Sequence, residues 1–250
     1  MTIEIKLEGQ SSDTCFDFTV HHDGGVVPAT FWNAKDNGSS LPQVTLVQHG
    51  GPFHKRHETA DWLAGSIVEQ SGSAVLLIDG PIHGQRRSDQ PSPEDMLANF
   101  ERYWREEAGI EQMVSDWKLA LDAVLQEGWA DPERVAWLGM SMGTAYGIPL
   151  CASDERIKVA GLGMWGMDWG QEASLLDYAG HVKTPLLFQI KAEDEIFTTE
   201  GQRELFHALG SPNKCLRTLS GGHTTRTPGQ LEQLLDFISR TFADQGGASK

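Results

Sequence analysis

The chain has 250 residues, enough for one large domain with a continuous hydrophobic core, although this length also permits two small domains. Its 35 acidic and 20 basic residues give a formal charge of −15, which repels phosphate backbones and anionic lipid headgroups. Nucleic-acid and membrane partners are therefore not expected. We predict a single domain over residues 1–245 and a frayed tail over 246–250.

The first third of the chain is predicted to form β-strands, because short apolar runs alternate with polar or glycine-rich turns. The expected strands cover residues 2–7, 15–20, 27–33 and 44–48. The first three would form an antiparallel meander. The fourth is interpreted as a strand buried inside a sheet.

Strands and helices alternate from residue 60 onward. Helices are expected over residues 60–69, 110–125, 142–152 and 231–238. Strands are expected over residues 74–78, 135–138, 159–163, 186–190 and 216–219. This alternation predicts the α/β class, with a mostly parallel central sheet, helices on both of its faces and the antiparallel meander at the amino-terminal side.

The sequence has no features of a secreted or membrane protein and no metal-binding or redox pattern among its cysteines. The amino-terminal residues contain no apolar signal core, and no stretch approaches the length of a membrane span, so a cytoplasmic protein is expected. Cys15, Cys151 and Cys215 have neither metal-ligand nor redox spacing. We expect them to be buried free thiols.

The run from Gly139 to Gly143 is the most informative motif. It reads Gly-Met-Ser-Met-Gly and lies between an apolar run and a small-residue stretch that can begin a helix. Glycines two residues before and after a serine suit a tight strand-to-helix turn, because larger side chains would clash and the hydroxyl projects from the sheet edge. Ser141 is therefore the candidate nucleophile.

A serine hydroxyl needs a base within hydrogen-bond reach, and a carboxylate must orient that base. Asp194 follows the strand expected at 186–190, and His223 precedes the last expected helix. Acid and histidine follow in this order where a nucleophile occupies such a turn. Glu193 and Glu195 flank Asp194, and three consecutive carboxylates are typical of a solvated surface run. Position alone favours Asp194 among them.

Acyl transfer also needs donors for the developing oxyanion. The loop after the strand at 44–48 supplies Gly51 as the first candidate, and Met142, directly after the serine, supplies the second. Pro52 cannot donate, which leaves Phe53 as the fallback. His49 is expected to shape this loop through hydrogen bonds and not to act as a base.

These residues carry a resemblance. The segment 49–52, the run 139–143, Asp194 and His223, in this order, resemble the α/β-hydrolase superfamily over nearly the whole chain. Within it, the segment 79–86 followed by a long helical region resembles small bacterial carboxylesterases of the dienelactone-hydrolase-like branch. Dienelactone hydrolases use a cysteine nucleophile, whereas this chain has a serine. The resemblance therefore implies ester hydrolysis more than dienelactone chemistry.

Two positions near Asp194 depart from the family pattern. Relatives often have glycine three residues before the acid and proline four residues after it, but this chain has Lys191 and Thr198. The geometry of the loop that carries the acid is left open by these differences.

The resemblance implies further residues around the site. Hydrolases of this fold insert lids after the strand that follows the nucleophile helix, so a small lid is expected within 165–180. Phe53, Trp165 and Trp169 are predicted to contact substrate, although an aromatic cluster is more often core. The implied activity is cleavage of small to medium carboxylic esters through an acyl-enzyme, with no cofactor and no metal.

Alternatives stay open at this stage. A thioesterase, lactonase or peptidase would use the same acyl chemistry, and a non-catalytic ligand receptor could use the same fold. The physiological substrate and the oligomeric state are not predicted.

Three histidines and two arginines have simpler interpretations than ligand binding. His49, His54 and His57 are expected at the rim of the pocket and not as metal ligands, because no pattern of a known metal site accompanies them. Arg86 or Arg87 could bind a substrate carboxylate, but pairing of both with the acidic surface is slightly favoured.

Overall fold

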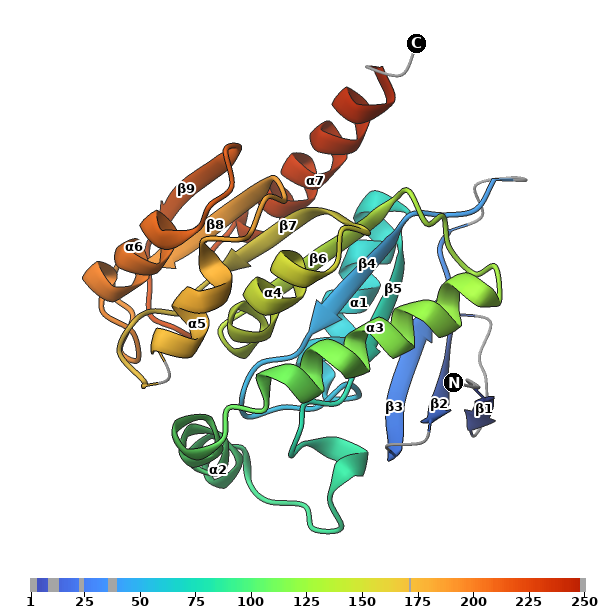
Figure 1. The fold of residues 1–250 in the computed structure, drawn as a ribbon, viewed down its shortest axis with the longest axis horizontal. Coiled ribbons are helices and arrows are strands. Elements are labelled where there is room, and N and C mark those ends of the chain that lie inside the picture. The colour runs from blue at the N-terminus through green and yellow to red at the C-terminus, as the bar shows by residue number, and fades with distance from the viewer. Residues whose placement is uncertain (1–3, 9–13, 23–24, 36–39, 171, 248–250) are drawn as a thin grey trace.

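A nine-stranded mixed sheet forms the centre of the molecule (Figure 1). The structure is a computed structural model, and it describes residues 4–8, 14–22, 25–35, 40–170 and 172–247. The strand order is β1-β2-β3-β5-β4-β6-β7-β8-β9. The strands are β1 (Glu4–Glu8), β2 (Cys15–His22), β3 (Gly25–Trp32), β4 (Val44–Gln48), β5 (Ala74–Ile78), β6 (Val135–Met140), β7 (Ile157–Gly163), β8 (Leu186–Lys191) and β9 (Lys214–Leu219).

Strand direction divides the sheet into two parts. Neighbours from β1 to β3 pair antiparallel, as does β3 with β5, whereas all neighbours from β5 to β9 pair parallel. The carboxyl ends of the parallel strands consequently meet at one edge of the sheet, where ligand sites of such sheets lie. The predicted meander and parallel sheet are confirmed.

Helices cover both faces of the sheet. They are α1 (Glu58–Ser71), a 3₁₀ turn (Gly84–Arg86), α2 (Pro93–Glu106), α3 (Ile110–Gln126), α4 (Met142–Ser153), α5 (Glu172–Ala179), α6 (Thr199–Ala208) and α7 (Gln230–Gly247). In Figure 1, α3 and α4 lie in front of the sheet and α1 and α7 behind it. Strand side chains alternate between these layers: Leu46 and Leu76 join one buried cluster, Val47 and Leu77 the other.

The sequence patterns did not predict α2 or α6. The signals for α2 are nevertheless present, because Ser92 caps the helix by accepting from the Asp95 amide at 3.2 Å and proline follows the cap directly. Its buried residues recur at every fourth position: Met96, Phe100 and Trp104. In α6, a helix with a mostly polar sequence, a similar cap at Thr198 is the clearest signal.

Some predicted ends and burials differ in the structure. The first strand begins at Glu4, and residues 2–3 of its predicted range lie outside the described residues. Helix α7 continues to Gly247, so the frayed tail predicted over 246–250 is wrong for its first two residues, and 248–250 lie outside the described residues. The expectation of three buried thiols is wrong for two, since Cys151 is buried but Cys15 and Cys215 are half-buried, near the sheet margins.

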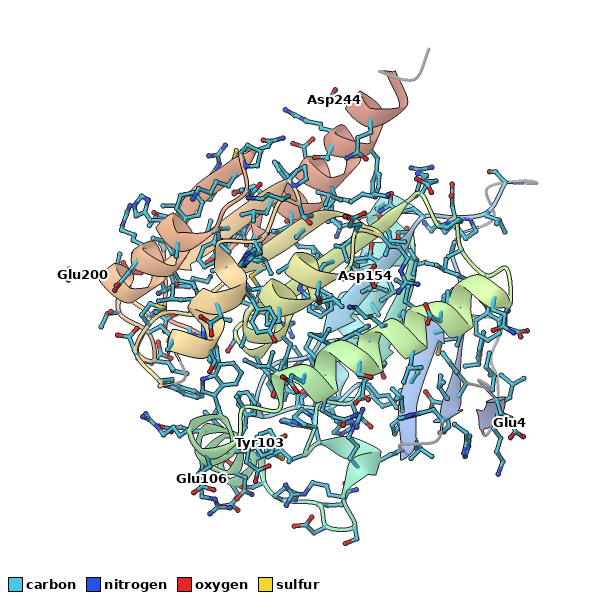
Figure 2. The ribbon with its side chains drawn as sticks, in the orientation of Figure 1. Glu4, Tyr103, Glu106, Asp154, Glu200 and Asp244 are labelled. Carbon is cyan, nitrogen blue, oxygen red and sulfur yellow. The ribbon has the colours of Figure 1, made fainter. Side chains whose placement is uncertain are left out.

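The negative charge is contributed from several sides of the molecule. Glu4 in β1, Glu106 in α2, Glu200 in α6 and Asp244 in α7 are exposed and lie at the outer boundary in Figure 2. No helix within the described ranges is both long and apolar enough to cross a bilayer.

Candidate active site

Ser141 lies at a sharp turn between β6 and α4. Its backbone has φ 56° and ψ −121°, a left-handed conformation that is costly for a residue with a side chain. A methyl group at Gly139 would lie 2.6 Å from the Gly143 carbonyl oxygen, and one at Gly143 would lie 3.2 Å from that of Gln48. Close backbone approach therefore explains why glycine occupies both flanking positions.

Hydrogen bonds from β7 hold this turn in place. The Ser141 amide donates to the Gly163 carbonyl at 2.9 Å, and the Gly163 amide donates to Thr144 Oγ1 at 2.7 Å. The Thr144 hydroxyl lies 2.9 Å from the Gly139 carbonyl oxygen that it can donate to. The strained backbone is thus fixed by bonds on both sides of the serine.

A chain of hydrogen bonds joins the three residues that the sequence selected. Ser141 Oγ lies 3.0 Å from His223 Nε2, and His223 Nδ1 lies 2.9 Å from Asp194 Oδ2. An ionised carboxylate can only accept, so Nδ1 carries the hydrogen and Nε2 presents its lone pair to the serine hydroxyl. The geometry can therefore remove a proton from Ser141.

The environment of Asp194 keeps it ionised. Its side chain is fully buried, and this burial by itself disfavours the charge. Hydrogen bonds from the imidazole of His223 and from the Phe197 and Ile196 amides outweigh burial, so the pKa of Asp194 lies below its ordinary value. A buried carboxylate with these donors can orient and stabilise an imidazolium.

The two neighbouring carboxylates bind the same loop. The Glu193 carboxylate accepts from the Gly221 amide, and Glu195 Oε2 accepts from the His223 amide at 2.8 Å. Glu193 and Glu195 are exposed, as a surface run would be, whereas the buried Asp194 is the member that reaches the imidazole. A methyl group at Gly222 would lie 2.5 Å from Glu195 Oε2, so glycine leaves room for this contact.

The Gly51 and Met142 amides make no hydrogen bond to any other described residue. Gly51 follows β4 and Met142 follows β6. These two strands are neighbours in the sheet, since Gln48 at the end of β4 pairs with Gly139 in β6. The fallback donor Phe53 is already engaged, since its amide donates to the Gly50 carbonyl at 3.0 Å. Two unpaired amides are thus present, one in the loop after β4 and one at the first residue of α4, directly after Ser141.

His49 orients the peptide that carries the Gly51 amide. Its Nε2 accepts from the Gly80 amide at 2.9 Å, so Nδ1 carries the hydrogen and donates to the Gly50 carbonyl at 2.9 Å. In a trans peptide the amide hydrogen points away from the carbonyl, which directs the Gly51 N–H to the opposite side. His49 is therefore a loop-shaping residue as predicted, but it is buried and does not lie at the rim.

His83 supports the same loop and was not predicted from the sequence. Its Nε2 donates to the Gly51 carbonyl at 2.8 Å, and its ring lies 4.9 Å from that of His49. Both imidazoles are buried, and loss of solvation lowers the pKa of each from 6.5 to about 3. Both rings therefore stay neutral at physiological pH.

These neutral histidines predict acid sensitivity of the fold. Below pH 6.5 the unfolded chain would bind a proton at each of them, whereas the folded protein would not until about pH 3. Stability should therefore be fully present above pH 6.5 and fall by about 2.7 kcal/mol per pH unit below pH ~6, which corresponds to about two protons. Urea unfolding between pH 7 and 5 measures this slope.

The variant His83→Gln should reduce that slope to about half, because one of the two protons is removed. His181→Gln, at an exposed position, is the matched control and should leave the slope unchanged. An equal slope in wild type and His83→Gln would show that His83 does not resist protonation.

An aromatic cluster adjoins the site. Phe197 lies 5.8 Å from the His223 ring, measured between centroids, and packs on Trp165 at 4.7 Å and Trp169 at 5.2 Å. Trp165 is 1% exposed, which leaves it almost no surface for a ligand, while Trp169 is 9% exposed. Phe53 is half-buried and stacks on His57.

Helix α2 covers the loop that carries Gly51. A methyl group on Gly51 would lie 3.0 Å from Phe100 Cδ1 and 3.3 Å from Leu97 Cδ1. Trp104 in the same helix donates to the Gly170 carbonyl at 3.0 Å, which ties α2 to the segment 165–180. That segment contains α5 and follows β7, where the lid was predicted.

The remaining candidates have structural partners. Arg86 pairs with the buried carboxylate of Asp116 at 2.6 Å, and Arg87 pairs with Asp89 at 2.6 Å. Pairing with the acidic surface, the favoured interpretation, is confirmed for Arg87, whose partner is exposed, but is wrong for Arg86, whose partner lies inside the protein. His54 accepts from the Arg56 amide. Among the residues with described positions, no cluster of histidine, cysteine and carboxylate groups could hold a metal ion.

Comparison with known proteins places this site in a family. No family model matches the sequence. A solved structure described as a novel cold-adapted esterase from an Arctic intertidal metagenomic library, bound to PEG, is 30% identical, with a TM-score of 0.80, and the alignment covers 96% of this chain and 99% of that one. The chain belongs to the α/β-hydrolase superfamily.

Other relatives of this α/β-hydrolase are more distant. "Putative hydrolase YtaP" of Bacillus subtilis (strain 168) is 28% identical over 170 residues, which cover 64% of this chain and 54% of that protein, so the match spans about half of that curated relative. An acetyl xylan esterase from Paenibacillus sp. R4 is 17% identical with a TM-score of 0.68, covering 96% of this chain and 89% of that one, and supports the fold alone.

Proposed function

We propose that this α/β-hydrolase is a serine hydrolase that cleaves carboxylic esters of small to medium size through an acyl-enzyme. The hydrogen-bonded series from Ser141 through His223 to Asp194 carries the proposal. The 30% identity to an esterase over nearly the whole chain adds support for ester substrates.

The proposed reaction has two halves. His223 Nε2 takes the Ser141 proton as the oxygen attacks the ester carbonyl, and the Gly51 and Met142 amides stabilise the oxyanion. The imidazolium, stabilised by Asp194, then protonates the leaving alcohol. Water then attacks the acyl carbonyl while it loses a proton to His223, and the imidazolium returns this proton to Ser141 Oγ as the acid leaves. Each step uses groups of this chain, so the mechanism calls for no cofactor.

The surroundings of the site favour a compact acyl group. Phe100 and Leu97 close the side of the loop next to Gly51, and Phe197 lies against the ring of His223. We propose Phe53 and Trp169 as substrate contacts, with the more deeply buried Trp165 supporting Trp169 from behind at 5.3 Å. We further propose that the protein acts in the cytoplasm on small-molecule substrates.

A fluorophosphonate probe and a substrate panel test this function. The probe should label wild-type protein at Ser141, identified by peptide mass spectrometry, and Ser141→Ala should show no labelling. p-Nitrophenyl esters of increasing acyl length should be hydrolysed with a cutoff in chain length, in parallel assays with thioesters, lactones and peptides. A folded wild-type protein that neither labels nor turns over any ester would instead be a ligand receptor.

A further inference from the structure

Lys191, the last residue of β8, is a fully buried cation three residues before Asp194. Its ammonium group donates to the Thr225 carbonyl at 2.7 Å, to Thr227 Oγ1 at 2.6 Å and to Gln230 Oε1 at 2.9 Å. An ammonium group has three hydrogens, so these three bonds use all of them. Two acceptors lie in the segment between His223 and α7, and the third belongs to the first residue of that helix.

Burial of the Lys191 ammonium group costs solvation free energy. Burial lowers the pKa of Lys191, opposed by the negative charges of Asp194 and Glu193. A charge removed from water is tolerated when hydrogen bonds satisfy it fully, as they do here. A side chain without a donor at this position would leave the three acceptors without this bond.

The segment that Lys191 binds begins with two glycines and is held by several hydrogen bonds. Gly221, with φ 94°, and Gly222 precede His223 and give the backbone wide conformational freedom. Thr227 Oγ1 donates to the Ser220 carbonyl at 2.8 Å, which closes residues 220–227 into a loop. Lys191 binds the far end of this loop, while Glu195 binds the His223 amide at its centre.

We propose that Lys191 is a positioning residue for His223, holding the loop 220–230 so that the imidazole stays between Ser141 and Asp194. The inference rests on the proposed hydrolase function. Two groups at the end of β8 then hold His223 in place. Asp194, in the loop after β8, orients the imidazole, and Lys191, the last residue of β8, binds the loop that follows His223. Lys191 itself touches no reacting atom.

The variant Lys191→Met tests this inference, because methionine is apolar, unbranched and similar in length but donates no hydrogen bond. We expect kcat to fall about tenfold to hundredfold, since a misplaced base costs reaction rate, with KM changed by no more than about twofold. The rate of fluorophosphonate labelling of Ser141 should fall by the same factor as kcat. Lys183→Met, at an exposed position, is the matched control and should behave as wild type.

Wild-type protein is measured first, so that the hydrolase function and the role of Lys191 are tested independently of each other. Absence of turnover and labelling in wild type would count against the hydrolase function. Normal wild-type turnover with unchanged kcat in Lys191→Met would overturn the role of Lys191. If Lys191→Met does not fold, Gln230→Met removes one acceptor of Lys191 and leaves the bond between Thr227 and Ser220 in place. A fall in its kcat at constant KM supports the role, and an unchanged kcat overturns it.

Discussion

Replacing His223 by glutamine is expected to lower kcat by about 10⁶-fold, because the serine loses the group that takes its proton. The two buried histidines that contact the loop at Gly51 cannot replace it. His49 and His83 are buried and engaged in hydrogen bonds, and the pKa of each is about 3. Steady-state hydrolysis of a p-nitrophenyl ester measures the effect.

The matched control for His223→Gln is His181→Gln, which changes an exposed histidine after α5 and should keep wild-type kcat. Circular dichroism and thermal unfolding confirm that both variants are folded. Residual activity within about tenfold of wild type in folded His223→Gln would mean that another group acts as the base.

Asp194→Asn is expected to lower kcat by about 10⁴-fold with the fold preserved. An asparagine amide can donate toward His223 Nδ1, which stabilises the tautomer that holds its hydrogen on Nε2 and cannot accept from serine. Neither neighbour can substitute, because Glu193 is bound to the Gly221 amide and Glu195 to the His223 amide. The measurement is kcat beside the free energy of unfolding.

Glu200→Gln provides the control for Asp194→Asn. Glu200 is an exposed acid in α6 and lies at the outer edge of the molecule in Figure 2. Its variant should keep full activity. A folded Asp194→Asn protein with wild-type kcat would assign the orienting role to a different carboxylate.

The parts of the site that the sequence predicted depend on local chemistry. The two glycines around Ser141 reflect backbone contacts within the turn and with β4, which is adjacent in the sheet. Parallel strands bring their carboxyl ends together whatever the loop sequences are, so the order of Ser141, Asp194 and His223 along the chain was sufficient to predict that they meet.

The parts that were missed depend on contacts between distant segments. Glu195 resembles a surface residue in sequence, and only the approach of the loop at His223, 28 residues later, gives its carboxylate a partner. His83 meets Gly51 across 32 residues for the same reason. Lys191 was recognised as a departure from the family pattern, but its three acceptors lie 34 to 39 residues away and could not be inferred from spacing.

Helix α2 was missed for a different reason. Its capping residue, proline and buried residues at every fourth position are all visible in the sequence, so the helix could have been found by applying the same periodicity rule to residues 92–106. This omission also concealed that Phe100 covers the loop at Gly51. The sequence therefore predicted only the small lid within 165–180 and not the contribution of α2 to the surroundings of the site.

In the proposed mechanism, Ser141 becomes acylated because His223, oriented by Asp194, removes the proton of the serine hydroxyl. Rapid mixing of wild-type protein with excess p-nitrophenyl acetate, followed by acid quench and peptide mass spectrometry, tests it most directly. We expect a burst of p-nitrophenol stoichiometric with enzyme and an acetyl group on Ser141, with neither in His223→Gln. Hydrolysis that proceeds without a covalent intermediate at Ser141, or with the acetyl group on another residue, would contradict it.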